Sequence, residues 1–135
     1  PPQALKLEVT ESTVMGDATV VQKTVHDLRE LGVAISMDDF GTGFSSLSLL
    51  HQLPFDILKI DRSFISRLPK EVQLVQTILQ LAEGFGMSVV AEGVETEEQL
   101  SLMRQLRCKY AQGYFFARPL PADSATEYIL AQIAP

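Results

Sequence analysis

The chain has 135 residues, of which 46% are hydrophobic and 21% charged, a composition that excludes a disordered tail and fits one folded domain. No apolar run approaches the roughly 18 residues that cross a bilayer, so we expect no membrane segment in this chain, although a longer parent could be membrane-anchored. The formal net charge of −6 argues against DNA as a partner. Because the single cysteine, Cys108, cannot form an internal disulfide, we expect a cytoplasmic protein in a reducing compartment.

Segments with strand-like and helix-like patterns alternate along the whole chain. In order, the patterns predict a strand at 5–9, a helix at 17–31, a strand at 33–37, a helix at 45–53, a strand at 57–60, a helix at 71–85, a strand at 88–91, a helix from residue 96, a strand at 110–112 and a helix at 124–133. Thr96 and Gln99 form a capping box at the start of the fourth helix. Pro54 ends the second.

This alternation predicts an α/β fold in which parallel strands are joined by crossover helices. Two architectures remain open on the pattern alone, a doubly wound open sheet and a (β/α) barrel of TIM type. The missing dinucleotide-type glycine fingerprint after the first strand slightly disfavours the open sheet. A closed barrel needs about 250 residues, so the chain would supply an incomplete barrel of about five βα units.

Polar side chains follow each of the predicted strands. They are Glu8, Glu11, Asp38, Asp39, Lys59, Asp61, Glu92, Glu95 and Gln112. Because the carboxyl ends of the strands meet at one mouth of a parallel barrel, we expect these groups to lie together in a site. Taken singly, each carboxylate is more often an ordinary surface acid, and Lys59 an ordinary solvated or ion-paired lysine, so the argument rests on the joint pattern.

Carboxylates that converge on one mouth repel one another unless cations lie between them. Oxygen ligands without histidine or cysteine suit Mg²⁺ or Mn²⁺. Adjacent strand residues point to opposite faces, so Asp38 and Asp39 can face one site only where the strand breaks, and we attribute that break to Gly41 and Gly43. Two metal ions could activate a water against a phosphodiester, while Lys59 orients that water or neutralises developing charge.

Other residues of functional type have simpler interpretations. His26 and His51 fall within helical segments and are expected at the surface, and Cys108 is expected to be buried or half-buried. We expect four phenylalanines to lie in the core or in a pocket wall, namely Phe40, Phe44, Phe64 and Phe116.

Five motifs resemble, in the same order, those of the EAL domain family. They are LEVTES at 7–12, DDFGTGFSSL at 38–47, LKIDRSF at 58–64, AEGVET at 91–96, and QGY at 112–114 with RPL at 118–120. The resemblance covers nearly the whole chain, so residues 1–135 are expected to be the C-terminal portion of an EAL domain. It implies a bacterial signalling enzyme with a TIM-type barrel that hydrolyses cyclic di-GMP to linear pGpG with two Mg²⁺ or Mn²⁺ ions.

The resemblance also implies a role for individual residues. Glu8 and Asp38 would bind the first metal ion, with Asp38 bridging to a second ion held by Asp39. Lys59 would hold the attacking water, and Glu95 would act at that water or at the second ion. The supporting residues would be Glu11, which braces the DDFGTG loop, and Glu92, Glu98 and Gln112. Substrate contacts are assigned to Arg62 and Arg118.

The family's Glu-Ala-Leu motif and the asparagine ligand of its next strand have no counterpart in this sequence. We therefore expect the parent protein to be the phosphodiesterase, and residues 1–135 alone to be inactive or nearly so. The alternative is a catalytically silent EAL receptor that binds cyclic di-GMP or a protein partner. The open strand edges of an incomplete barrel predict a homodimer or larger assembly. The resemblance implies sensory and/or GGDEF domains in the parent.

Overall fold

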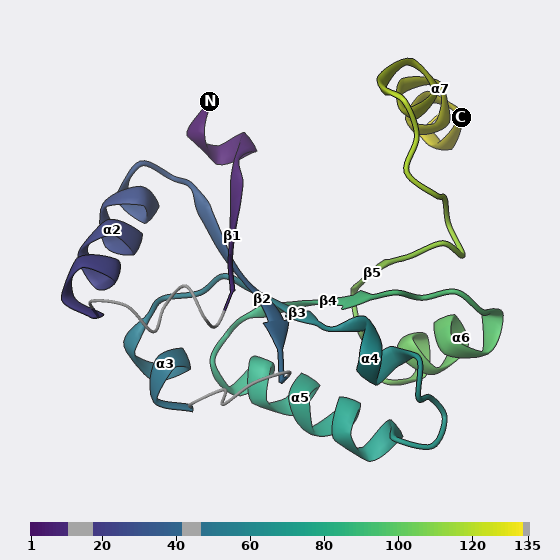
Figure 1. The fold of residues 1–135 in the computed structure, drawn as a ribbon, viewed down its shortest axis with the longest axis horizontal. Coiled ribbons are helices and arrows are strands. Elements are labelled where there is room, and N and C mark those ends of the chain that lie inside the picture. Colours follow the sequence, from purple (N-terminus) through teal and green to yellow (C-terminus); the bar gives the residue numbers. More distant parts are fainter. Residues whose placement is uncertain (11–17, 42–46, 134–135) are drawn as a thin grey trace.

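A computed structural model describes residues 1–10, 18–41 and 47–133, except for the side chains of residues 18, 48 and 49 (Figure 1). The elements are η1 (Pro2–Ala4), β1 (Lys6–Thr10), α2 (Ala18–Glu30), β2 (Ala34–Phe40), α3 (Leu47–Gln52), β3 (Ile57–Ile60), α4 (Arg62–Ile65), α5 (Val72–Gly84), β4 (Ser88–Glu92), α6 (Glu97–Gln105), β5 (Tyr110–Gln112) and α7 (Ala122–Ile133). The predicted alternation of strands and helices is confirmed. The interpretations that rest on Glu11, Gly43 and Phe44 fall outside the described residues.

The five strands form one parallel sheet, and each strand pairs with the one that precedes it in the chain. A doubly wound sheet contains a point where the strand order reverses, whereas this sheet runs β1-β2-β3-β4-β5 without a reversal. That order is the one found in a TIM-type barrel, so the fold is an open part of such a barrel. β1 and β5 form its two edges (Figure 1).

The core lies between the strands and the helices that cover them. β3 contributes Leu58 and Ile60, which are fully buried, and α5 contributes Val75, Ile78 and Ala82 from one helical face. The helical spacing in the sequence predicted that face of α5. α7 differs from the other helices because it stands apart from the sheet (Figure 1) and buries none of its residues.

The short helix α4 was not predicted from the sequence. Asp61 caps it, because its side chain accepts a hydrogen bond from the Ser63 N–H at 2.9 Å. Phe64 and Ile65 are buried, and the Phe64 ring packs so closely on Gly41 that a Cβ there would lie 2.9 Å from the ring. α4 therefore connects the end of β3 to the backbone that follows β2.

Most predictions for single side chains are confirmed. His26 and His51 are exposed, Cys108 is half-buried, and Phe40 and Phe64 are buried. Phe116 is 41% exposed and lies outside the core, but it lines a surface pocket with Leu100 and Met103, so the prediction of a pocket wall is confirmed for this ring. Among residues 1–10, 18–41 and 47–133, no helix has the length and apolar character needed to span a bilayer.

Candidate active site

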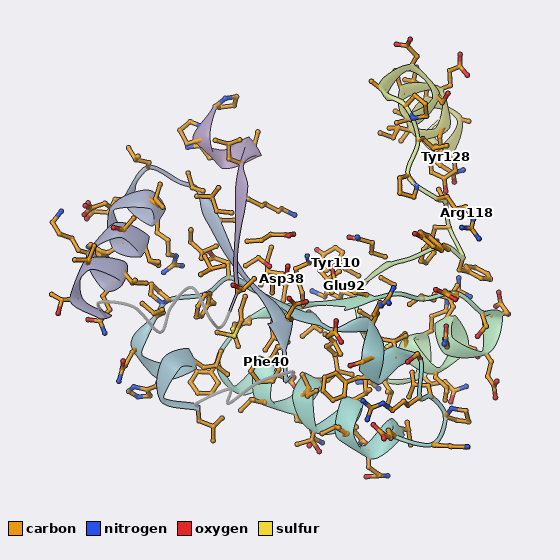
Figure 2. All side chains as sticks on the ribbon, viewed as in Figure 1. Asp38, Phe40, Glu92, Tyr110, Arg118 and Tyr128 are labelled. Atoms are coloured by element: carbon orange, nitrogen blue, oxygen red, sulfur yellow. The ribbon has the colours of Figure 1, made fainter. Side chains whose placement is uncertain are left out.

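Lys59 lies at the centre of a group of carboxylates at the carboxyl ends of the strands. Its Nζ is 2.8 Å from Glu8 Oε1, 3.0 Å from Asp38 Oδ1 and 2.8 Å from Glu92 Oε1. These acids come from β1, β2 and β4, so the sheet brings three other strands to the lysine of β3. Asp38 and Glu92 lie near each other in Figure 2. Only 8% of Lys59 is exposed, so solvent screens its contacts with the largely buried Asp38 and Glu92 weakly.

The carboxylates fix the protonation state of Lys59. Burial acts to lower its pKa, but hydrogen bonds to Glu8, Glu92 and Asp38 outweigh burial and hold the pKa above the ordinary value for lysine. Burial also raises the pKa of Glu92, an effect that Lys59 opposes. In this arrangement of carboxylates, Lys59 is therefore a charged hydrogen-bond donor at neutral pH.

Asp38 and Asp39 face one site because the strand is irregular at Asp39 itself. Asp39 has φ +54°, in the left-handed region that aspartate tolerates better than most residues, and the register with β3 shifts between Met37 and Phe40. β2 ends at Phe40 and Gly41 follows it with φ +92°, as predicted for the break, but the irregularity already begins at Asp39, and Gly43 lies outside the described residues. Carboxylate oxygens of Asp38, Asp39 and Glu92 consequently lie within 4.8 Å of one another.

This carboxylate group fits a divalent cation. Within the described residues, Asp38 Oδ1 is buried, and the contact that the structure shows for it is the ion pair with Lys59 at 3.0 Å. Burial and the neighbouring Asp38 raise the pKa of Asp39. A donor set of oxygens alone suits Mg²⁺ or Mn²⁺ rather than zinc. Asp38, Asp39 and Glu92 could hold such an ion, and Glu8 lies beside them at Lys59.

Three other predicted site residues lie at the same end of the sheet but are exposed. Glu95 follows β4, and its backbone N–H donates to Gln99 Oε1 at 2.8 Å. In the described part of the chain, neither the ion pairs of Lys59 nor the carboxylate group includes Glu95. Glu98 lies in the first turn of α6, and Gln112 ends β5, where its carbonyl accepts from the Val94 N–H at 3.0 Å.

The two arginines assigned to substrate contacts lie in different places. Arg62 is the exposed first residue of α4, and its side-chain stem packs against Gly93. The Arg118 guanidinium lies 4.6 Å from the centre of the Tyr114 ring, a cation–π arrangement. Figure 2 shows Arg118 on the segment that leads to α7, away from Asp38 and Glu92. Arg62 is thus near the loop after β4, whereas Arg118 does not join the carboxylate group.

Sequence reasoning gave Glu92 only a supporting role, although the structure places it in direct contact with Lys59. Its position as the last residue of β4 was the available signal. Sequence reasoning also assigned no function to Gln99 beyond its place in a capping box. Its side chain is buried and links the loop after β4 to helix α4, a contact for which the sequence carries no signal.

The EAL domain model matches residues 1–119. The chain belongs to the EAL domain family. This EAL chain is 46% identical over 130 residues to the cyclic di-GMP phosphodiesterase NbdA of Pseudomonas aeruginosa. That similarity covers 94% of this chain but 17% of NbdA, so the chain spans about a sixth of the length of this relative.

Solved EAL structures show the same fold. The EAL domain of Mycobacterium smegmatis DcpA is 39% identical and has a TM-score of 0.92, and the similarity covers 100% of this chain and 62% of that one. A manganese and cyclic di-GMP complex of Klebsiella pneumoniae BlrP1 is 33% identical with a TM-score of 0.80, and the similarity covers 87% of this chain and 31% of that one. The predicted family and the TIM-type fold are confirmed.

Proposed function

We propose that the EAL protein containing this chain hydrolyses cyclic di-GMP to linear pGpG with Mg²⁺ or Mn²⁺ bound at the mouth of the barrel. The observation that carries the proposal is the contact of buried Lys59 with carboxylates from three other strands. The name of NbdA and the ligands of the BlrP1 complex support the substrate and the metal class. Glu8, Asp38 and Asp39 would hold the ions, which supply Lewis-acid activation of water and of the phosphodiester when bound.

Lys59 acts as a hydrogen-bond donor in this scheme. Its charged Nζ would orient the attacking water and then stabilise the negative charge that develops on the phosphoryl oxygens. The water oxygen forms a bond to phosphorus as the bond from phosphorus to a ribose 3′ oxygen breaks. Among the described residues, Glu92 and Glu95 are carboxylates of this mouth that could accept the proton of the water. Glu92 contacts Lys59 directly and would hold its ammonium group in place, whereas Glu95, as the family resemblance implies, would act at the attacking water.

Residues 1–135 would not complete this reaction alone. The Glu-Ala-Leu glutamate and the asparagine ligand that the family resemblance implies have no counterpart among them. The first metal ion would then have Glu8 and Asp38 as its ligands from this chain, which predicts weak metal binding. We therefore expect the isolated chain to be inactive or nearly so.

The test is the formation of pGpG from cyclic di-GMP by the full-length protein, with Mn²⁺ or Mg²⁺ and with EDTA. Lys59→Met and Glu92→Gln are each expected to lower kcat by about 100-fold or more, in line with the loss of a charged group that acts on the transition state. Glu97→Gln is the matched control, because Glu97 is an exposed acid paired only loosely with Arg104 at 3.8 Å. It should change kcat less than twofold.

Turnover that survives EDTA or the Lys59 variant would contradict the proposal. Binding of cyclic di-GMP by the full-length protein without hydrolysis would instead support the receptor alternative.

A further inference from the structure

The loop that carries Glu95, residues 93–96, is held by both neighbouring elements. Val94 at its centre is fully buried. The Val94 N–H donates to the Gln112 carbonyl at 3.0 Å, and the Val94 carbonyl accepts from the Phe115 N–H at 2.9 Å. One side of the loop is therefore fixed to β5 and to the turn that follows it.

Gln99 fixes the other side of the same loop. Its side-chain Oε1 accepts hydrogen bonds from the N–H groups of Glu95 at 2.8 Å and Thr96 at 3.1 Å. Its Nε2 donates to the Ile65 carbonyl at 3.2 Å. Gln99 is only 9% exposed and Ile65 is fully buried, so these bonds are shielded from water. A buried amide with such bonds is costly to disrupt, because truncation leaves its partners unsatisfied.

The bond to Ile65 is not explained by helix capping. Capping of α6 requires Thr96 Oγ1, which accepts from the Gln99 N–H at 3.2 Å, and Gln99 Oε1, which accepts from the Thr96 N–H. The Nε2 group instead reaches α4, which begins directly after the strand of Lys59 and is capped by Asp61. The Gln99 side chain therefore links the loop after β4 to the helix after β3.

We propose that Gln99 is a positioning residue that sets the place of Glu95 relative to Lys59 in the reaction. The inference rests on the proposed function, in which Glu95 would act at the attacking water, as the family resemblance implies. Among the described residues, Glu95 is held through its backbone N–H rather than through its carboxylate, so the position of its backbone decides where that carboxylate can reach. Phosphoryl transfer loses rate steeply when a participating group moves by about an ångström.

Three variants of the full-length protein separate positioning from capping. Gln99→Met removes both the acceptor for the Glu95 and Thr96 N–H groups and the donor to the Ile65 carbonyl. Gln99→Glu keeps an acceptor for the Glu95 and Thr96 N–H groups, as in a common capping box, but loses the donor to Ile65. Thr96→Ala weakens the helix cap and leaves the Gln99 side chain in place, so it is the control for loss of stability alone.

Two measurements are made on each variant. Hydrogen exchange of the Glu95 and Thr96 amides reports the link without any turnover, and we expect it to be at least tenfold faster in Gln99→Met. In hydrolysis of cyclic di-GMP, we expect both Gln99 variants to lower kcat at least tenfold while KM changes less than threefold. Thr96→Ala should keep kcat within twofold even where its melting temperature falls as far as that of Gln99→Met.

The inference is overturned if Gln99→Met keeps the kcat of the wild type, or if kcat falls in proportion to melting temperature across all three variants. A wild-type protein that does not hydrolyse cyclic di-GMP refutes the proposed function instead. In that case hydrogen exchange alone tests the link through Gln99. Unchanged protection of the Glu95 and Thr96 amides in Gln99→Met would refute it.

Discussion

Substitution of Lys59 by methionine removes the charge at the centre of the carboxylate group and keeps a side chain of similar length. Glu8, Asp38 and Glu92 would then face one another without the ammonium that lies within 3.0 Å of each. Removal of one partner from a buried ion pair costs about 3–5 kcal/mol, because the remaining charge stays buried without compensation.

The expected cost here is somewhat lower, because the three contacts differ in exposure. The Glu8 side chain is 53% exposed, so solvent screens this contact, whereas the side chains of Asp38 and Glu92 are 20% and 17% exposed. Exposed ion pairs contribute up to about 1 kcal/mol. We therefore expect Lys59→Met to lower the free energy of unfolding by about 2–4 kcal/mol, carried mainly by Asp38 and Glu92.

The pH dependence of this effect has a defined sign. The pKa of Lys59 is raised on folding, so its contribution to stability is fully present below the unfolded value near 10.4 and is lost only as the pH rises through the higher folded value. Lys59→Met should consequently be destabilised at pH 7. It should recover part of the loss in acid, where protonation removes the repulsion between the carboxylates.

Urea unfolding followed by circular dichroism, at pH 7 with EDTA, measures this cost. Lys23→Met is the matched control, because Lys23 pairs with Asp27 at 2.6 Å on the surface, with side-chain exposures of 78% and 52%. It should change the free energy of unfolding by less than about 0.5 kcal/mol. Mn²⁺ should stabilise Lys59→Met more than the wild type, since a cation can replace the lost charge. A Lys59→Met variant as stable as the Lys23 control in EDTA would refute this reasoning.

Three further predictions concern the fold around the site. In thermal unfolding, Gly113→Ala should destabilise the fold by about 1–3 kcal/mol, because its Cβ would overlap the backbone N and O of Val94. Gly84→Ala, measured in the same way, should stabilise the fold by about 0.5–1 kcal/mol, because Gly84 lies in a helix with open space around the position of the new Cβ. Asp61→Ala should cost about 1 kcal/mol through loss of the α4 cap. Burial acts to raise the pKa of Asp61, but hydrogen bonds from Ser63 outweigh burial and leave that pKa lowered. The difference in free energy of unfolding between Asp61→Ala and the wild type should therefore be full above about pH 4 and shrink as the pH falls further. A difference that grows in acid would contradict this prediction.

Local sequence determined the elements themselves. The apolar run at 57–60 and the short run at 110–112 are strands with the predicted bounds, and the capping box at Thr96 opens α6 as expected. Each of these features depends on residues that are close together in the chain, so a local pattern is enough to predict it. The polar residues at the strand ends could also be assigned to one mouth from the sequence, because parallel strands place their carboxyl ends on one side of the sheet.

Tertiary structure alone decided which of those polar residues meet. The contact of Lys59 with Glu8, Asp38 and Glu92 depends on the pairing of strands from distant parts of the chain. The left-handed backbone at Asp39 accompanies a shift in pairing with β3, and no pattern within β2 specifies that shift. The partner of the Gln99 amide is a carbonyl of α4, a helix too short to produce a periodic signal. Sequence patterns indicate on which face of its helix or strand a side chain lies. The distance between side chains of different elements is fixed only when those elements pack against each other.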